Sequence, residues 1–301
     1  MNRLQCGIAG VLLALGCSAG GSSGSTVEST GPGTLSTSPG GRATPPAGLA
    51  GDGPRGDLID PALLEMPDEC NGVIPITYRD FNGSHPDFEM AFSGDVVRRQ
   101  LIAPALGQGN KPTFLSSIGC PAQQGTPTAC ANWMVQDRPV ITSAASFDQW
   151  YRDTPGVNIA FPSTLELIET PAGSGVYKYS SNDFFPIPVS AGFGATPPGQ
   201  AKNFLFTTEI HLNFEYIARQ SFTFRGDDDL WIFINGRLAL DLGSMHGQEE
   251  GTINFDAQAA DLGIVPGGAY PMDIFHAERH TTGSNFGIET NIACFVPATV
   301  Y

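Results

Sequence analysis

Three consecutive aspartates, Asp227, Asp228 and Asp229, lie directly before one of the most apolar runs of the chain. Carboxylates about 5 Å apart repel each other by about 1 kcal/mol in water, and by several times more beside a packed strand. A bound cation would relieve this repulsion. Calcium fits best, because it takes about six to eight oxygen ligands and no nearby histidine or cysteine favours a softer metal. The alternative is a solvated acidic turn.

The residues after the triplet predict a hairpin that positions it. Residues 230–234 are apolar throughout, which predicts a strand buried on both faces. Asn235-Gly236 is typical of a type I′ turn, and leucines recur at every second position beyond it. The aspartates therefore stand at the entrance of a β-hairpin.

Other strands are predicted elsewhere in the chain. Residues 204–216 alternate between apolar and mostly polar side chains, which predicts one core face and one wet face. Further strand patterns lie at 74–81, 88–92, 270–280 and 286–295. Many short strands separated by Gly- and Pro-rich turns predict an all-β fold, an antiparallel β-sandwich with long loops at 101–139 and 186–200.

The first seventeen residues predict export. Asn2 and Arg3 give a positive start, residues 8–15 are mostly apolar, and a small-residue cleavage region ends in Cys17. This segment resembles a bacterial lipoprotein signal peptide, which implies cleavage before Cys17 and lipidation of that cysteine. We expect the protein at the outer membrane or cell surface, attached to the membrane only through its lipid. Plain secretion is the alternative.

The signal precedes a tether and one folded domain. Residues 18–58 are rich in Gly, Ser, Thr and Pro and have almost no aliphatic pattern. Such a segment cannot bury enough apolar surface to offset its ordering entropy, so we expect a disordered linker. Residues 70–296 are long enough for a single β-sandwich domain with a substantial core.

The cysteines agree with an oxidising compartment. Apart from those in the signal, Cys70, Cys120, Cys130 and Cys294 form an even set, which allows three pairings. We favour Cys120 with Cys130, which closes a short loop, and Cys70 with Cys294, which joins the two ends of the domain. Each bridge would stabilise the fold by about 2 to 4 kcal/mol.

Charge narrows the class of partner. The chain has 15 basic and 30 acidic residues, a formal net charge of -15. Nucleic acid and anionic membrane surfaces are poor partners for such a chain. Cations and neutral, hydroxyl-rich ligands such as sugars are compatible with it.

Two segments resemble a known family. They run from Gly226 to His246 (GDDDLWIFINGRLALDLGSMH) and from Ala277 to Phe286 (AERHTTGSNF), and they are similar to the signature of the fibro-slime domain. That family is a relative of the protective-antigen-type ("PA-fourteen") β-sandwich. The resemblance covers about residues 74–292 and is loosest at 101–139. It implies a lectin-like sandwich.

The resemblance also implies a calcium site. In lectin members of the wider family, two adjacent aspartates joined by a cis peptide and a loop asparagine hold a calcium ion that coordinates sugar hydroxyls. The equivalent residues here are Asp227, Asp228 and Asn285, for both the metal and the carbohydrate. Asp229 departs from the pattern, because glycine usually stands there. Asp241 and His246 could approach the same edge, although structural hydrogen bonding is the favoured interpretation for both.

One further group of side chains resembles a metal-binding triad. His276, Glu278 and His280 would share one face of a regular strand, but zinc peptidases place their histidines on a helix with another spacing, so a structural role is favoured.

The leading hypothesis is a non-catalytic, calcium-dependent, carbohydrate-binding adhesion lipoprotein. The second is a structural or protein-interaction module of the envelope with a purely structural calcium. The third is a polysaccharide-degrading enzyme or its accessory domain, for which no catalytic motif is present.

Overall fold

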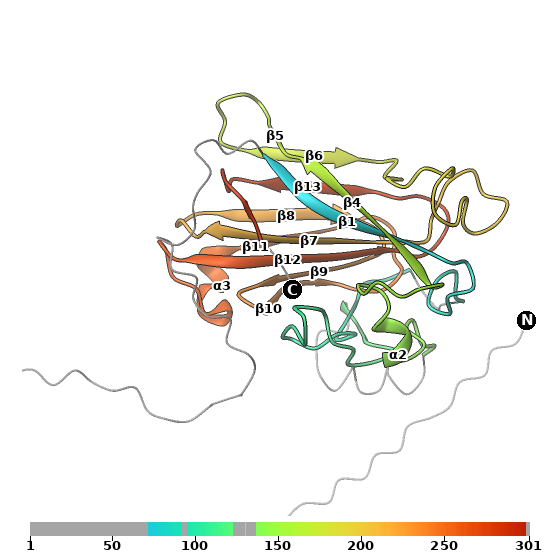
Figure 1. Ribbon diagram of the computed structural model, residues 1–301. Coiled ribbons are helices and arrows are strands. Elements are labelled where there is room, and N and C mark those ends of the chain that lie inside the picture. Colours follow the sequence, from blue (N-terminus) through green and yellow to red (C-terminus); the bar gives the residue numbers. More distant parts are fainter. Residues whose placement is uncertain (1–71, 92–94, 123–129, 131–136, 299–301) are drawn as a thin grey trace, which may run out of the picture. The chain divides into compact units, whose positions relative to one another are not determined.

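Two antiparallel sheets pack face to face in the computed structural model, which describes residues 72–91, 95–122, 130 and 137–298 (Figure 1). The larger sheet has the order β10-β9-β12-β7-β1-β4, and β14 also pairs with β7. Its strands are β1 (Val73–Phe81), β4 (Asn158–Glu166), β7 (Phe206–Glu215), β9 (Asp229–Ile234), β10 (Arg237–Leu242), β12 (Ala269–Glu278) and β14 (Val296–Pro297). The predicted all-β sandwich is thus confirmed.

The smaller sheet has the order β11-β8-β13-β6-β5. Its strands are β5 (Ile168–Glu169), β6 (Tyr177–Ser181), β8 (Ser221–Gly226), β11 (Glu249–Asn254) and β13 (Phe286–Thr290). Among the described residues, the other elements are the ladder of β2 (Arg98–Arg99) with β3 (Cys120–Pro121) and the helices α2 (Ala144–Phe147) and α3 (Phe255–Leu262). No helix of the described residues is long and apolar enough to cross a membrane.

The main core lies between the two sheets. The alternation of side chains along each strand sends one set inward, including Phe206 and Ile210 of β7, Phe224 of β8 and Ile288 of β13. These side chains are at most 2% exposed. The facing strands therefore close a dry interior, which supplies most of the hydrophobic stabilisation of the sandwich.

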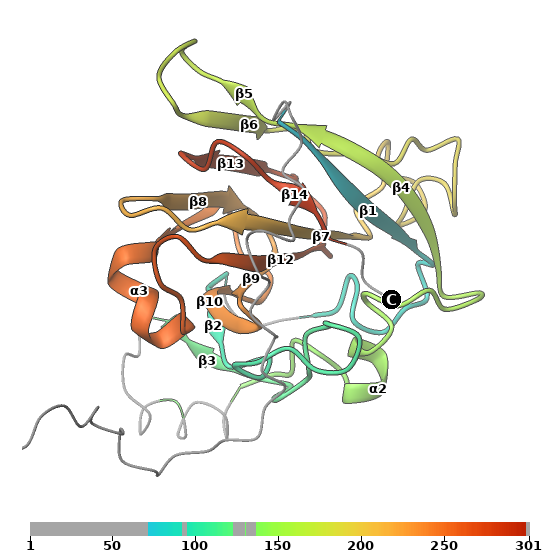
Figure 2. The same cartoon turned by 60° about the vertical axis from the view of Figure 1, so that its left-hand side comes forward.

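A second core covers the other face of the larger sheet. Trp231 and Phe275 point away from the main core and pack with Phe147 and Trp150, which come from α2 and the residues just after it. In Figures 1 and 2 the segment 95–122 and α2 gather beside β9 and β10. Residues 95–122 and 137–151 thus form a covering segment on this face of the larger sheet.

This cover corrects the prediction for the strand at 204–216. The alternating pattern suggested a wet face, yet Thr207 and Glu209 of β7 are 0% and 4% exposed. The prediction was wrong because β7 is a central strand of the larger sheet, and side chains pack against both of its faces. The predicted strand at 88–92 is also not formed by residues 88–91, the described part of that segment, which are two bends followed by irregular chain.

The hairpin that carries the acidic triplet has the predicted form. Asn235 and Gly236 both have positive φ, 52° and 71°, and join β9 to β10. All six residues of β9 are buried, as expected for a strand packed on both faces. The turn chemistry of Asn-Gly thus fixes the register of the strand that begins at Asp229.

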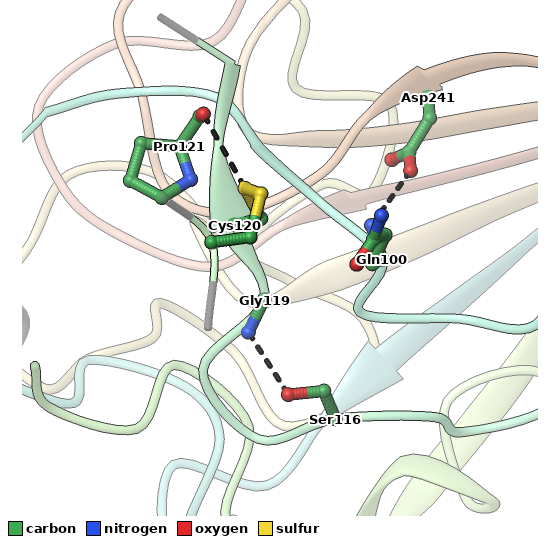
Figure 3. Close-up of a disulfide and its surroundings, with 7 residues drawn as sticks. Gln100, Ser116, Gly119, Cys120, Pro121 and Asp241 are labelled. Carbon is green, nitrogen blue, oxygen red and sulfur yellow. Dashed lines mark hydrogen bonds between the residues drawn. A yellow bond between two sulfur atoms is a disulfide. The ribbon is translucent and has the colours of Figure 1, made fainter. Parts of the chain in front are cut away.

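One predicted disulfide lies within the described residues. Cys120 and Cys130 form the predicted bridge, next to the turn in which Gly119 donates its N–H to Ser116 Oγ (Figure 3). Cys294 is also disulfide-bonded. Its predicted partner Cys70 lies outside the described residues, as do the signal with Cys17 and the linker at 18–58.

Candidate functional site at the Asp227–Asp228 turn

The turn between β8 and β9 places two of the aspartates at the end of the sandwich. β8 ends at Gly226 and β9 begins at Asp229, so Asp227 and Asp228 form the link, and the peptide bond between them is cis. The bond has the form that the family resemblance implied. The two residues are 9% and 7% exposed, so both carboxylates are largely withdrawn from water.

Asp227 is joined to the asparagine that the sequence analysis selected. Asn285 lies just before β13, and both its main-chain N–H and its side-chain Nδ2 donate to the Asp227 carboxylate, the latter at 2.7 Å. Gly226 permits this approach, because a Cβ there would lie 2.8 Å from the Asn285 carbonyl oxygen. Residues 58 positions apart in the sequence therefore meet at one point.

Asp228 binds main-chain donors from two other segments. Its Oδ1 accepts from the N–H of His246 and its Oδ2 from the N–H of Arg279, both at 3.1 Å. These segments follow β10 and β12, so one carboxylate connects the ends of both strands. Charged acceptors make the stronger hydrogen bonds in proteins, and this carboxylate therefore helps to fix the turn.

Asp229 faces the interior instead. Its side chain pairs with the Arg279 guanidinium at 2.6 Å, and both side chains are fully buried. Its other oxygen accepts from the N–H of Ser244 at 2.6 Å. Arg279 also donates to the carbonyl of Asp87, in the turns after β1, and to the carbonyl of Val140 in the covering segment. The third aspartate is thus a structural counterion of Arg279.

A pocket opens beside the first two aspartates. It has a volume of about 260 Å³, and its lining includes Asp95, Asp227, Asp228, His246, His280 and Thr281. Drug-sized ligands occupy somewhat larger clefts, of about 300 Å³ and above, so this pocket suits an ion with one small polar group. Carboxylates, hydroxyl groups and imidazoles together make its wall strongly polar.

Several acidic side chains are buried around the turn, and burial disfavours their charged forms. Burial raises the pKa of Asp228 well above its usual value, and repulsion from Asp229 and Asp227 raises it further against the opposing charge of Arg279. Burial likewise raises the pKa of Glu278, with added repulsion from Asp228 and Asp227. Its Oε2 atom has no hydrogen-bond partner among the described residues.

These residues fit a hard cation. The donors are carboxylate and amide oxygens, the type that calcium prefers, and a divalent ion would relieve the repulsion among the buried acids. Within the described ranges, no three side chains among His, Cys, Asp and Glu gather closely enough to hold a metal. Two aspartates and one asparagine would therefore need main-chain or water oxygens to complete a calcium shell.

The histidine cluster on β12 serves the turn in another way. His276 Nε2 donates to the Asp227 carbonyl at 2.7 Å, and its Nδ1 lies 3.2 Å from Thr208 Oγ1. Burial lowers the pKa of His276 to about 4, so the ring is neutral near neutral pH. His276 is fully buried whereas His280 lines the pocket, which agrees with the structural interpretation of this cluster.

Asp241 and His246 have the structural roles that were favoured for them. Asp241 accepts from the Gln100 N–H at 3.0 Å (Figure 3). It also accepts from Trp231 Nε1 at 3.0 Å, and it is not among the residues that line the pocket. Burial raises the pKa of Asp241 to about 6. His246 has ring nitrogens close to the carbonyls of Leu242 and Gly247 while also lining the pocket.

Some pocket residues were not found from the sequence. Asp95 lies outside both segments that carry the family resemblance, and it accepts from the Gly247 N–H. No local pattern marks it, because only the fold brings position 95 to the turn. Thr281 and Thr282 lie inside the recognised AERHTTGSNF segment, so proximity to Asn285 was a usable signal for them.

The family comparison covers this region. Residues 195–294 match the family model of the PA14 domain, the protective-antigen type. The match covers about a third of the chain and includes the turn with both aspartates, the hairpin after it and the segment with Asn285. The last third of the chain is therefore similar to PA14 domains in sequence.

Similar proteins occur in Dictyostelium discoideum. The chain is 33% identical to Protein psiD over 225 residues, which are 73% of this chain and 41% of that protein. It is also 33% identical to Protein psiC over 213 residues, 69% of this chain and 38% of that protein. The chain thus spans about two fifths of the length of these curated relatives.

Solved structures give weak likenesses only. A PA14 sugar-binding domain from an RTX adhesin is 16% identical, with a TM-score of 0.21, over 31% of this chain and 50% of that one. The Epithelial Adhesin 6 A domain of Candida glabrata, in complex with Galb1-3GlcNAc, is 13% identical with a TM-score of 0.23, over 73% of this chain and 78% of that one.

Proposed function

We propose that this chain is a non-catalytic carbohydrate-binding module for adhesion, and that calcium at the Asp227–Asp228 turn makes its binding possible. One observation carries the proposal: Asp227 and Asp228 line an open polar pocket, and Asn285, from a segment far away in sequence, binds the Asp227 carboxylate next to that pocket. The PA14 match over the same segments and the acidic, cation-compatible charge of the chain support it.

Each residue would have a separate task. Asp227 and Asp228 would hold the ion with their carboxylates, and Asn285 would contribute its amide oxygen after a rotation of the side chain that now donates to Asp227. When bound, calcium supplies open coordination positions that a pair of sugar hydroxyls can fill in exchange for water. Thr281, Thr282 and His280 at the pocket would offer hydrogen bonds to the remaining hydroxyls.

The proposal includes a surface location. We propose export under the N-terminal signal and lipidation at Cys17, with residues 18–58 as the tether, or secretion if Cys17 is not lipidated. The disulfides at Cys120–Cys130 and at Cys294 support an oxidising compartment. A surface module with a sugar pocket would serve attachment to polysaccharide or matrix.

A glycan array tests the carbohydrate part. The purified full chain should bind a subset of printed glycans in 1 mM calcium, and binding should disappear with EDTA and with Asp228→Asn. Glu249→Gln removes the same charge from an exposed position outside the pocket and should bind like the wild type. An array without calcium-dependent binding by the wild type would overturn the proposal.

A second candidate function is an envelope protein-interaction module with a structural calcium. The observation that favours it is the use of Asp228, whose oxygens already accept from His246 and Arg279 and so connect three segments. This alternative predicts a calcium-dependent unfolding temperature together with a blank glycan array. The two candidates therefore separate in the same pair of experiments.

A further inference from the structure

A polar hollow lies on the outer face of the smaller sheet. It has a volume of about 250 Å³ and lies over β6, β13, β8 and β11, which neighbour one another in the sheet. The strands β6, β13 and β8 can be followed in Figures 1 and 2. Phe224 and Ile288 point into the main core, so Arg225, Gly287 and Glu289 point outward. The hollow is separate from the pocket at the aspartates, because no lining residue is shared.

A glycine without a packing reason forms the floor. Gly287 lies in the middle of the five-residue strand β13, paired with Ser180 on one side and Arg225 on the other. A Cβ at Gly287 would have ordinary contacts of 3.5 Å or more, and its φ is not in the left-handed region. A glycine inside a strand often marks a place where a ligand approaches the backbone.

The walls of the hollow are rich in both donors and acceptors. Lys178 pairs with Glu289 at 2.8 Å, and Arg225 donates to Ser180 Oγ at 3.1 Å. Glu250 stands opposite Arg225 in the ladder of β11 with β8. Two cationic and two anionic side chains give no net charge, which suits a neutral ligand with many hydroxyl groups better than an anion or a cation.

The ladder connects this hollow to the aspartate turn. Gly287 pairs with Arg225 and Phe286 pairs with Gly226, so the next pair along β13 and β8 is Asn285 with Asp227. Two residues of strand span about 7 Å, which places the hollow directly beside the candidate ion site. A ligand longer than one sugar could cover both places.

We propose that the hollow over Gly287 is an extension subsite, which binds further residues of a neutral glycan whose first sugar sits at the Asp227–Asp228 turn. The proposal rests on the proposed function and gives it a ligand class, extended neutral oligosaccharides. The second sugar lies on the bare backbone at Gly287, and Arg225, Ser180 and Glu289 exchange hydrogen bonds with its hydroxyls.

A length series tests the subsite. The purified full chain is applied, in calcium, to a printed ladder of glucose, mannose and galactose oligomers from one to six residues. Wild type should bind the trisaccharide or longer of at least one series about tenfold more tightly than the monosaccharide. Gly287→Val fills the hollow with a good strand-forming residue and should lose that gain, as should Arg225→Gln.

Controls separate the possible failures. Ser221→Val lies on the same outward row of β8, outside the hollow, and should keep the full gain with length. Unfolding temperatures and calcium titration verify that each variant is folded. No gain with length in the wild type, or a full gain in folded Gly287→Val, would overturn the subsite alone. Absence of all glycan binding by the wild type would defeat the proposed function and the subsite with it.

Discussion

At the scale of single residues, the three aspartates have three different environments. Asp227 contacts Asn285, Asp228 accepts from two main-chain N–H groups, and Asp229 pairs with buried Arg279. The first two aspartates form the link between β8 and β9, whereas the third is the first residue of β9. Adjacent residues of one type therefore divide into two candidate ligands and one structural counterion.

The Asp229–Arg279 pair should be important for stability. Arg279→Met leaves the buried Asp229 carboxylate without its counterion, and removal of one partner of a buried pair costs about 3 to 5 kcal/mol. We expect a loss of that size in the free energy of unfolding, measured by urea denaturation. Adding Asp229→Asn to this variant should restore part of the stability, because the uncompensated charge is gone. A double variant that lost as much stability as Arg279→Met, or that lost the sum of the two single-variant losses, would contradict a coupled pair.

Two glycines on paired strands should respond differently to alanine. A Cβ at Gly226 would lie 2.6 Å from Phe224 and 2.8 Å from the Asn285 carbonyl, so Gly226→Ala should cost about 1 to 3 kcal/mol by overpacking. Gly287→Ala is the matched control and should change the free energy of unfolding little, because space is available there. Guanidinium denaturation of both variants provides the comparison, and equal losses would contradict the packing argument.

At the scale of elements, the covering segment is held to the larger sheet by an ion network. Glu209 of β7 pairs with Arg79 of β1 and with Lys111 from the segment 95–122. His211, on the same face of β7, lies between Glu209 and Asp273 of β12. The polar side chains of β7 thus bind the covering segment instead of water.

This network predicts a pH dependence. Burial lowers the pKa of His211, but its hydrogen bonds with Asp273 and Glu209 outweigh burial and raise it. A raised folded pKa gives stability that is fully present below about pH 6.5, the unfolded value, and is lost as the pH rises through the folded pKa. The free energy of unfolding should therefore decrease above about pH 6.5, and less so in His211→Gln.

Glu209 should act in the opposite pH range. Although burial opposes its ionisation, the hydrogen bond from His211 and the charges of Arg79 and Lys111 lower its pKa to about 2. Its stabilisation is present above about pH 4.3 and is lost as the pH falls through about 2.

Urea denaturation of wild type and His211→Gln from pH 5 to 9 isolates the contribution of the histidine, since the contributions of other groups cancel in the difference. Parallel curves would contradict its role.

At the scale of the whole molecule, local sequence patterns predicted the strands better than they predicted which faces of those strands are buried. Asn235-Gly236 and the apolar run before it specify a hairpin through turn chemistry and burial, which depend on neighbours in sequence. The burial of Glu209 and His211 depends on a cover formed far away in sequence, so the same alternation that predicts a strand gave the wrong exposure for one face.

The candidate site shows the same limit. Asp227, Asp228 and Asn285 could be selected from the family resemblance, and the structure brings Asn285 into contact with Asp227. Asp95 and the hollow over Gly287 could not, because they arise from the meeting of separate strands and segments. A sequence motif identifies residues through their neighbours in sequence, whereas a pocket forms only when separate strands and segments come together in the fold.

Calcium binding at the turn is the central claim, and calorimetry tests it most directly. Calcium is titrated into the EDTA-treated full chain, for wild type and for Asp227→Ala/Asp228→Ala, with unfolding measured alongside. We expect saturable binding of one ion in the wild type only, with about 2.7 kcal/mol of added stability at a calcium concentration of 100 times Kd. Absence of saturable binding in the wild type, or equal binding in the variant, would contradict the account.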